Sequence, residues 1–393
     1  MRSLESQNKY PDCLWMQLEA IPVQSSVADP QQLDLYLSLN FNEHWESLLN
    51  GRVKFGLQGG TLRLKLENCE IPLASRQLVG SFKLEEPDKN QPSNSSQLTT
   101  SSGAKSELVH YTACHISMKD SDANPAWVFA IEKSESVLKG LLKSAKLGQF
   151  TAKPCRIEAT FEVSKQDIHL TDAEGLWRHD ITPNQHAVLE RSLALYLLET
   201  KLQPYLSWAQ LCYDCSTLEK YEVATFDPKA ESHLQALIDQ VVHAGTHNFL
   251  ELANLVNLNL TIDFAGGNLR GTTLNGVDFS GANLYRVNLR GADLSDADLS
   301  DANLQEAKLG GADLSGAFLG DANLSHADLH RASFALANLS GADLRGANLR
   351  EVNLVNANLS GTHVQDAQFG KNSGISLEMK HHLQQQGAIF EDE

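Results

Sequence analysis

The sequence has no long apolar run. No stretch of about 18 apolar residues occurs anywhere in its 393 residues, which argues against a transmembrane helix. The first residues, Met1 to Gln7, also lack the apolar segment that follows the charge in a secretory signal peptide. We therefore predict a soluble protein of the cytoplasm.

Basic charge is also scarce. The chain has 32 Lys and Arg residues against 49 Asp and Glu residues, which gives a formal net charge of -17. Acids outnumber bases before residue 253, in residues 253–370 and in the tail that follows. Because phosphate groups attract basic surfaces, we expect neither nucleic acid nor a membrane as a direct partner.

Cysteine is infrequent, and the 6 cysteines do not suggest a disulfide-rich domain. Cys212 and Cys215 have Cys-x-x-Cys spacing, but the sequence has no second pair to complete a zinc site and no thioredoxin-like βαβ pattern around them. We interpret them as two cysteines at helix ends, with a metal or redox role as the alternative.

Catalytic signatures are absent too. The sequence contains no GxSxG, HExxH or Walker A motif, and no GxGxxG follows a predicted strand. The histidines of the N-terminal region stand singly; they are His44, His110, His115, His169, His179 and His186. We predict that the protein is not an enzyme and has no catalytic residues, no cofactor and no metal.

What the sequence does have is a five-residue repeat. From Phe264 to Phe369, a Leu, Phe or Val occurs every fifth residue, 22 times without interruption, with a small or aliphatic residue two positions earlier. A helix would spread this period around its circumference, and a strand would send alternate members to opposite faces. The pattern therefore predicts a coil in which five residues form one side and both apolar positions point inward.

Units such as Ala292-Asp293-Leu294-Ser295-Asp296 resemble those of the pentapeptide-repeat family, and the ending Gly387 to Asp392 resembles the tails of cyanobacterial members. The resemblance implies a right-handed quadrilateral β-helix with four units per turn. At a strand spacing of ~4.8 Å, about six turns would be roughly 29 Å tall.

We predict this β-helix over residues 251–370, with additional units at Ala253 to Leu255 and Leu258 to Leu260. A solenoid exposes an apolar end unless something covers it. Residues 371–393 are predicted to supply that cover at the C-terminus, with a helix from Ile375 to Gln386 and the tail.

Alternating apolar residues dominate the N-terminal region, as in the run Leu33, Leu35, Leu37 and Leu39. Several strands without helical patterns between them predict an antiparallel β-sandwich or barrel-like domain over 1–175, so the protein as a whole is mainly β. The clearest predicted hairpin pairs 53–57 with 62–66 across Gln58-Gly59-Gly60. The polar tract 87–106 predicts a mobile loop.

The segment 176–250 predicts a helical connector that also caps the start of the solenoid. Thr182-Pro183 and Asp227-Pro228 are helix start signals, and apolar residues from Leu234 to Val242 follow helical spacing. We expect the second of these helices to cover the open first coil.

Residues twenty apart lie on one side of a four-sided coil. One side carries bases after its central residues, namely Arg270, Arg290, Arg331 beside His330, and Arg350. The next two sides carry aspartates, namely Asp278, Asp293, Asp296, Asp298, Asp301, Asp313 and Asp321. Steering of a charged partner explains this segregation, and so does chance alignment of polar positions.

A second surface feature is apolar. Phe318 stands where other units have Asp or Asn, and Ala335, Leu336 and Val355 stand where others have Ser, Gly or Arg. These four residues are predicted to form one exposed patch. Such a patch marks a contact with another chain or with the N-terminal domain.

Together these features predict a non-catalytic protein-protein interaction protein, either a scaffold or a regulator, that binds through the sides of the solenoid and pairs with another protein or forms a homodimer. The candidate partner-binding residues are Phe318, Ala335, Leu336, Val355, Arg270, Arg290, Arg331 and Arg350. One alternative, implied by the family resemblance, is an acidic DNA mimic that binds a type II topoisomerase such as gyrase. Another is a ligand-sensing β domain coupled to the solenoid.

Overall fold

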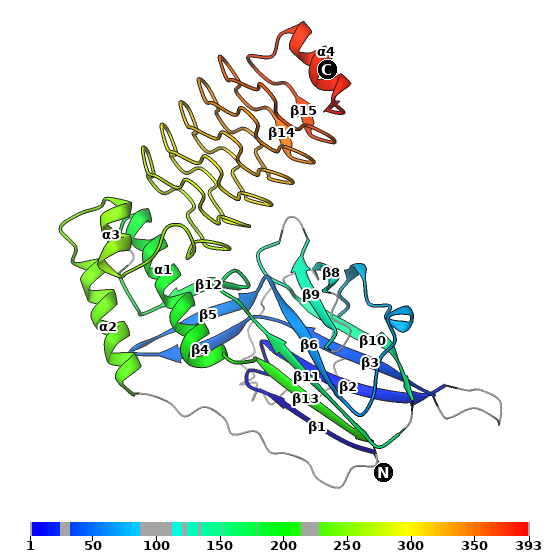
Figure 1. The fold of residues 1–393 in the computed structure, drawn as a ribbon. Coiled ribbons are helices and arrows are strands. Elements are labelled where there is room, and N and C mark those ends of the chain that lie inside the picture. Colours follow the sequence, from blue (N-terminus) through cyan, green and yellow to red (C-terminus); the bar gives the residue numbers. More distant parts are fainter. Residues whose placement is uncertain are drawn as a thin grey trace, which may run out of the picture. The chain divides into compact units, whose positions relative to one another are not determined.

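The computed structural model describes residues 2–23, 32–86, 112–119, 124–132, 135–151, 153–178, 180–213 and 228–391. The chain forms two compact units (Figure 1). A β-rich unit contains Met1–Leu48, Arg52–Ala173 and Leu198–Asp227, and a repeat unit contains Leu49–Gly51, Glu174–Leu197 and Pro228–Glu393. The predicted mobile loop at 87–106 lies outside the described residues.

The β-rich unit is made of antiparallel sheets, as predicted. A seven-stranded sheet has the order β1 (Arg2–Asn8), β13 (Ser207–Tyr213), β11 (Cys155–Glu162), β6 (Gly59–Glu67), β9 (Ala126–Ile131), β8 (Ala113–Lys119) and β7 (Gly80–Lys83). Two three-stranded sheets have the orders β10 (Gly140–Thr151), β3 (Gln32–Phe41), β2 (Leu14–Pro22) and β12 (Ile168–Glu174), β5 (Gly51–Leu57), β4 (His44–Leu48). A short 3-10 turn, η1, spans Leu73–Ser75.

The predicted hairpin across Gln58-Gly59-Gly60 is wrong. Strand β5 belongs to a three-stranded sheet, whereas β6 pairs with β11 and β9 in the seven-stranded sheet. The chain therefore passes from one sheet to another at Gln58, whose N-H donates to Asp167 O at 2.7 Å. A Cβ on Gly60 would lie 2.3 Å from the Phe161 ring, so this passage needs glycine.

The cysteines differ in part from expectation. Cys13, Cys69, Cys114 and Cys155 are free thiols. Cys212 lies in strand β13 rather than at a helix end, and it takes part in a disulfide. Cys215 lies outside the described residues.

The helices of the connector begin where the sequence predicts. Helix α1 spans Pro183–Leu197 and continues as a π-helical turn, η2 (Leu198–Leu202), and α2 spans Pro228–Val242. Helix α3 (Phe249–Leu255) occupies one of the stretches predicted as additional repeat units, so that prediction is wrong. In the parts of the chain that the structure describes, no helix has the length and hydropathy needed to cross a bilayer.

The repeat region is a four-sided β-helix in which each residue lies beside the residue twenty positions later. Leu304 N donates to Asn323 O at 2.7 Å, and Asn323 N donates back to Ala302 O at 2.9 Å. Equivalent parallel bridges join successive coils along the region, and the strands β14 (Asn348–Arg350) and β15 (Gln368–Gly370) are part of this ladder. The central Leu and Phe side chains and the preceding Ala side chains are buried, apart from the partly exposed Ala357 and Leu359, which confirms the predicted inward pair.

The first coil is covered mainly by α1 and α3. The Asn184 carboxamide donates to Thr273 O at 3.1 Å and accepts from Thr273 N at 2.9 Å, so it replaces the peptide group of a missing coil. From α3, the Phe249 ring packs on Phe264 at 5.3 Å. We expected α2 to cover this coil, but Gln185 of α1 instead bonds to Val241 O of α2.

At the other end, α4 (Leu377–Gln385) begins after the N-cap residue Ser376, close to the predicted start. Strand β16 (Ile389–Phe390) then pairs in parallel with β15, and the Phe390 ring stacks on Phe369 at 4.9 Å. The tail thus supplies a last, partial coil over the apolar end.

Replacing the buried Leu304 by Ala is expected to lower the free energy of unfolding by roughly 2 to 5 kcal/mol, because the coil core leaves little room for collapse around a cavity. Chemical unfolding of the full chain measures this loss. The exposed Leu336→Ala is the control, with an expected change within about 0.5 kcal/mol. Equal effects of the two variants would contradict the inward orientation.

Helix α1, which covers the first coil, contains a buried acid, Glu190, whose titration affects stability. Burial raises the pKa of Glu190 to about 7, although Asn268 donates to its carboxylate at 2.9 Å. Because the folded-state pKa lies above the unfolded one, the protonated form is favoured on folding, and stability falls as pH rises from about 4.5 to about 7.

Glu190→Gln, which keeps the acceptor for Asn268, is therefore expected to gain stability relative to the parent as pH rises from 5 to 8. The gain between these pH values should be about 2.5 kcal/mol, from 1.36 kcal/mol per pKa unit, because part of the difference is already present at pH 5. Chemical unfolding at both pH values measures it, with Glu351→Gln as control, since Glu351 is an exposed acid whose carboxylate lies 2.8 Å from Arg331 Nε. Parallel stability profiles for parent and Glu190→Gln would contradict the assignment.

Candidate protein-binding surface of the solenoid

Each five-residue unit presents three outward positions. The residue before the central one joins the ladder, and the two residues after it form a corner. The second corner residue always has positive φ, from Gly266 (φ 69) to Lys371 (φ 53). This left-handed conformation favours Gly, Asn and Asp, which explains why the sequence is small or polar there.

Four sides follow from the ladder. Side one contains ladder residues 268, 288, 308, 328, 348 and 368; side two 273, 293, 313, 333, 353 and 373; side three 278, 298, 318, 338 and 358; and side four 283, 303, 323, 343 and 363. We count the two corner residues after each central residue with its side.

Phe318, Ala335, Leu336 and Val355 form a cluster that we call the apolar corner. Phe318 bridges Asn338 of the next coil, two residues after Leu336, and Leu336 N donates to Val355 O at 2.9 Å. The side chains of Phe318, Leu336 and Val355 are 51%, 68% and 41% exposed, so they contribute little to the core. Ala335, which precedes Leu336, is half-buried.

Leu336 is also an unusual residue type for its backbone conformation. Its φ is 62°, and it is the one large apolar residue among the left-handed corner positions of residues 264–371, all of which the structure describes. The same corner has Gly276, Asp296, Gly316 and Asn356 in other coils. A leucine here bears about 1 kcal/mol of backbone strain. Its high exposure leaves most of that strain without a compensating gain from burial.

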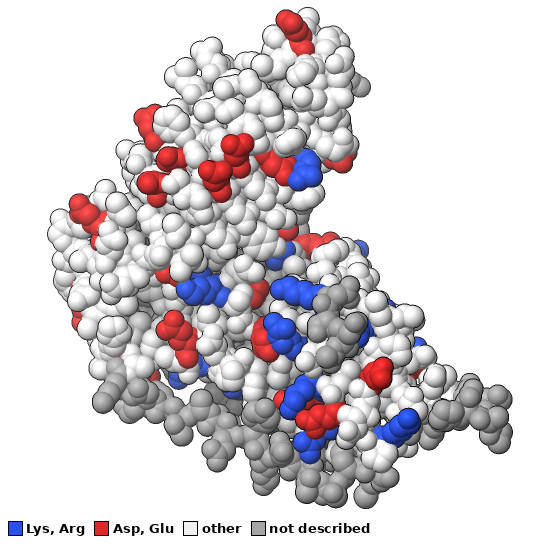
Figure 2. Space-filling view, viewed as in Figure 1, with Lys and Arg blue, Asp and Glu red and all other residues white. Residues whose placement is uncertain are grey.

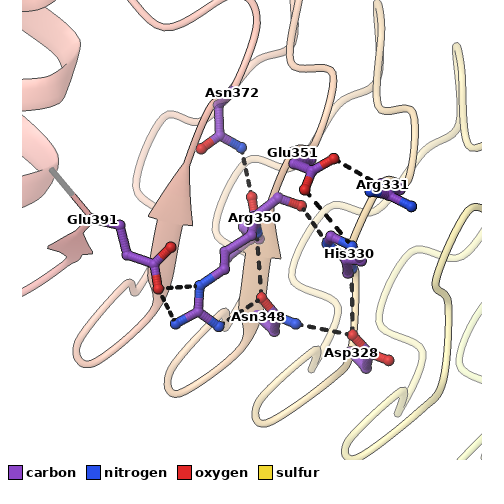
Figure 3. Close-up of polar contacts among 9 residues, drawn as sticks. Asp328, His330, Arg331, Asn348, Arg350, Glu351, Asn372 and Glu391 are labelled. Atoms are coloured by element: carbon purple, nitrogen blue, oxygen red, sulfur yellow. Dashed lines mark hydrogen bonds and ion pairs between the residues drawn. The ribbon is translucent and has the colours of Figure 1, made fainter. Parts of the chain in front are cut away.

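The predicted column of arginines is largely paired within the protein. Arg290 Nη2 lies 3.2 Å from Asp328 Oδ2, Arg331 Nε lies 2.8 Å from Glu351 Oε2, and Arg350 Nη2 lies 2.6 Å from Glu391 Oε1. Figure 3 shows two of these pairs beside the Asn348 side chain, which bonds to Asp328 at 3.1 Å. The hydrogen bond from Arg331 lowers the pKa of Glu351, so the acid stays charged.

Arg270 is exposed on the first coil, and it forms no ion pair with any acid in the described residues. The sequence predicted the basic column but not the acids that pair with it, Asp328, Glu351 and Glu391. Only Asp328 belongs to the same side's ladder, whereas Glu391 comes from the tail, 41 residues from Arg350. The ion pairs of the column therefore link coils to one another and to the C-terminal cover.

Charge is segregated around the solenoid. All seven Lys and Arg residues of the segment 264–370 lie on sides one and four; they are Arg270, Arg286, Arg290, Lys308, Arg331, Arg345 and Arg350. Sides two and three have none, but they carry all seven aspartates predicted for these sides. Figure 2 shows acidic side chains gathered on one face of the repeat region.

The β-rich unit contains a pocket of about 490 Å³. Its lining is mostly polar and includes Asn68, Cys69, Glu70, Gln149 and Lys153. Gln149 is held by a bond from its side chain to Asp34 at 2.8 Å. The described residues contain no group of three or more His, Cys, Asp or Glu side chains arranged to hold a metal.

Comparisons with known proteins bear on the repeat region alone. A family model described as pentapeptide repeats (8 copies) matches residues 262–301, 297–341 and 337–371, in agreement with the five-residue units of the coil. A comparison with curated proteins gives no match.

Solved structures similar to the chain include the pentapeptide repeat protein Rfr23 of the cyanobacterium Cyanothece 51142, with 30% identity over 27% of this chain and 90% of that one, at a TM-score of 0.25. A pentapeptide repeat protein of the Arabidopsis thaliana thylakoid lumen has 34% identity, covering 30% and 80% of the two chains, at a TM-score of 0.22. HetL of Nostoc sp. PCC 7120, involved in heterocyst differentiation regulation, has 34% identity, covering 27% and 53%, at a TM-score of 0.20.

Leu336→Asn is expected to raise the free energy of unfolding by about 0.5 to 1 kcal/mol, because asparagine tolerates the left-handed corner better than leucine. The matched control is Asn356→Leu at the same corner one coil later (φ 58), which should lower it by a similar amount. Chemical unfolding measures both. Destabilisation by Leu336→Asn would show that the leucine side chain supports the coil.

Proposed function

The chain belongs to the pentapeptide-repeat family through residues 262–371, and on that premise we propose that it is a non-catalytic interaction protein that binds another protein through the sides of its solenoid. Family membership supports a non-enzymatic repeat region. The β-rich unit stands outside the family match and is proposed to supply a second binding function.

The single observation that carries this proposal is the apolar corner. Three large side chains, Phe318, Leu336 and Val355, are exposed within adjacent coils, at positions where other coils have polar or small residues. Contiguous exposed apolar area on a protein surface is typical of a contact site. The strained backbone at Leu336 strengthens this interpretation, because strain that gives no stability is typical of functional positions.

The fold suits recognition because it is rigid. The inter-coil hydrogen bonds fix the spacing of outward side chains, as at Leu299 N to Phe318 O, 2.7 Å. A surface that is already ordered loses little conformational entropy on binding, so more of its contact energy appears as affinity.

The test compares the full chain with the double variant Phe318→Asn, Leu336→Asn, which restores residue types found at the same positions in other coils. Both proteins are used for affinity capture from a lysate of the native cells, followed by mass spectrometry. We expect a partner that the parent recovers and the double variant loses at least tenfold, because removal of central apolar contacts costs about 2 kcal/mol or more, about a thirtyfold change in Kd.

The control is Ile262→Asn, which removes an apolar side chain of similar exposure at the start of the solenoid and should leave recovery unchanged. Recovery that the double variant does not alter would contradict binding through the apolar corner. Circular dichroism of each variant confirms that the coil is intact.

A further inference from the structure

The apolar corner lies next to negative charge on the same sides of the solenoid. Phe318 bridges Asp298 of the preceding coil in the ladder, and Asp298 in turn bridges Asp278 one coil earlier. The corner position of Leu336 is continued by Asp296 two coils earlier, and Asp321 follows Phe318 by three residues. At a coil spacing of about 4.8 Å, these carboxylates lie within roughly 5 to 10 Å of the apolar side chains along the axis.

The described part of the chain does not neutralise these acids. None of the seven aspartates on sides two and three forms an ion pair with a Lys or Arg that the structure describes. Those that hydrogen-bond accept from backbone N-H groups or hydroxyls, as Asp278 does from Ser280 N at 2.9 Å. The hydrogen bonds from the Ser280 hydroxyl and N-H lower the pKa of Asp278, so this acid stays charged. By contrast, Arg286, Arg290, Arg331, Arg345 and Arg350 on the other two sides each form an ion pair with an acid.

The charge restricts what can cover the apolar corner. Phosphate groups of nucleic acids or anionic lipids would be repelled by the aspartates. A second copy of the chain that docked with the same face would bring seven further aspartates against them. A polypeptide with Lys or Arg beside its apolar residues complements both features at once.

We propose that the apolar corner and the aspartates of sides two and three form one docking surface for a basic segment of a partner protein, in which large apolar residues stand next to Lys or Arg. This inference rests on the proposed function and adds the chemistry of the partner. The apolar side chains hold the segment in place, and the aspartates accelerate its encounter and fix its direction along the coils.

The experiment uses a library of random 16-residue peptides displayed on phage, selected on the immobilised full chain. We expect selected peptides to combine Lys or Arg with Leu, Phe or Trp. Synthetic copies should lose at least tenfold in affinity for Phe318→Asn, Leu336→Asn. Their affinity should also fall about tenfold between 50 and 500 mM NaCl, because exposed charges are screened over a few ångströms at high salt.

A second variant isolates the charge. The double variant Asp298→Asn, Asp321→Asn keeps a side-chain oxygen that can accept hydrogen bonds at each position but removes two negative charges. It should weaken peptide binding severalfold and flatten the salt dependence of the affinity. Asp366→Asn on side four is the matched control, since this acid also has no ion pair in the described chain, and its effect should be negligible.

The outcomes separate the two proposals. Peptides that need Phe318 and Leu336 but carry no excess of Lys or Arg would overturn the basic partner and leave the proposed function standing. Failure to select any peptide that depends on these two residues would overturn the docking surface, while partner capture tests the proposed function independently. Self-association in sedimentation that the Phe318→Asn, Leu336→Asn variant abolishes would identify a second copy as the occupant and overturn the basic segment.

Discussion

The backbone ladder between coils is the interaction on which the rest of the repeat unit depends. Each unit donates from its central residue to the next coil and accepts from that coil, as between Leu304 and Asn323 at 2.7 Å. These bonds fix a repeat of twenty positions, so a side chain's place on the surface follows from its number. The buried Leu and Ala columns, the left-handed corners and the separation of charge all result from this register.

The ladder also creates a problem at both ends, where the last coil has unpaired peptide groups and an open apolar core. Different elements cover the two ends. At the start, the Asn184 carboxamide on α1 imitates a peptide group toward Thr273, and Glu190 accepts a hydrogen bond from the Asn268 side chain. At the finish, strand β16 continues the ladder with real backbone and stacks Phe390 on Phe369.

The five-residue period made the β-helix, its inward positions and the exposure of Phe318, Leu336 and Val355 predictable from the sequence, because one simple rule generates them all. The start of the coil was not predictable in this way. Ala253 and Leu255 satisfy the repeat, but in α3 only Ala253 lies on the buried face with Phe249 and Leu252, and Leu255 is exposed. Asn248 caps this helix, because its side chain accepts a hydrogen bond from Glu251 N at 3.1 Å. The cap and the apolar residues before Ala253 favour the helix over a further repeat unit.

The pairing of segments that are distant in the sequence was also not predictable. Strands β5 and β6 have the alternation and the glycines of a hairpin, but each finds its partner elsewhere in the chain, and nothing local to Gln58 encodes that choice. The same holds for Arg350, whose partner Glu391 is supplied only when the tail returns to the last coil. The family resemblance covers the solenoid alone, so it gave no help with the sheets of the first unit.

The two kinds of exposed feature on the solenoid have different physical meanings. Three of the four arginines of side one, Arg290, Arg331 and Arg350, form ion pairs with acids of other coils and of the tail, so much of their charge is balanced within the protein. The apolar corner does the opposite, because Leu336 adds strain to the coil and hides little surface. We propose that Leu336 serves an interaction outside the coil. The aspartates beside it form no ion pair with a Lys or Arg that the structure describes, and they favour a positively charged partner for that interaction.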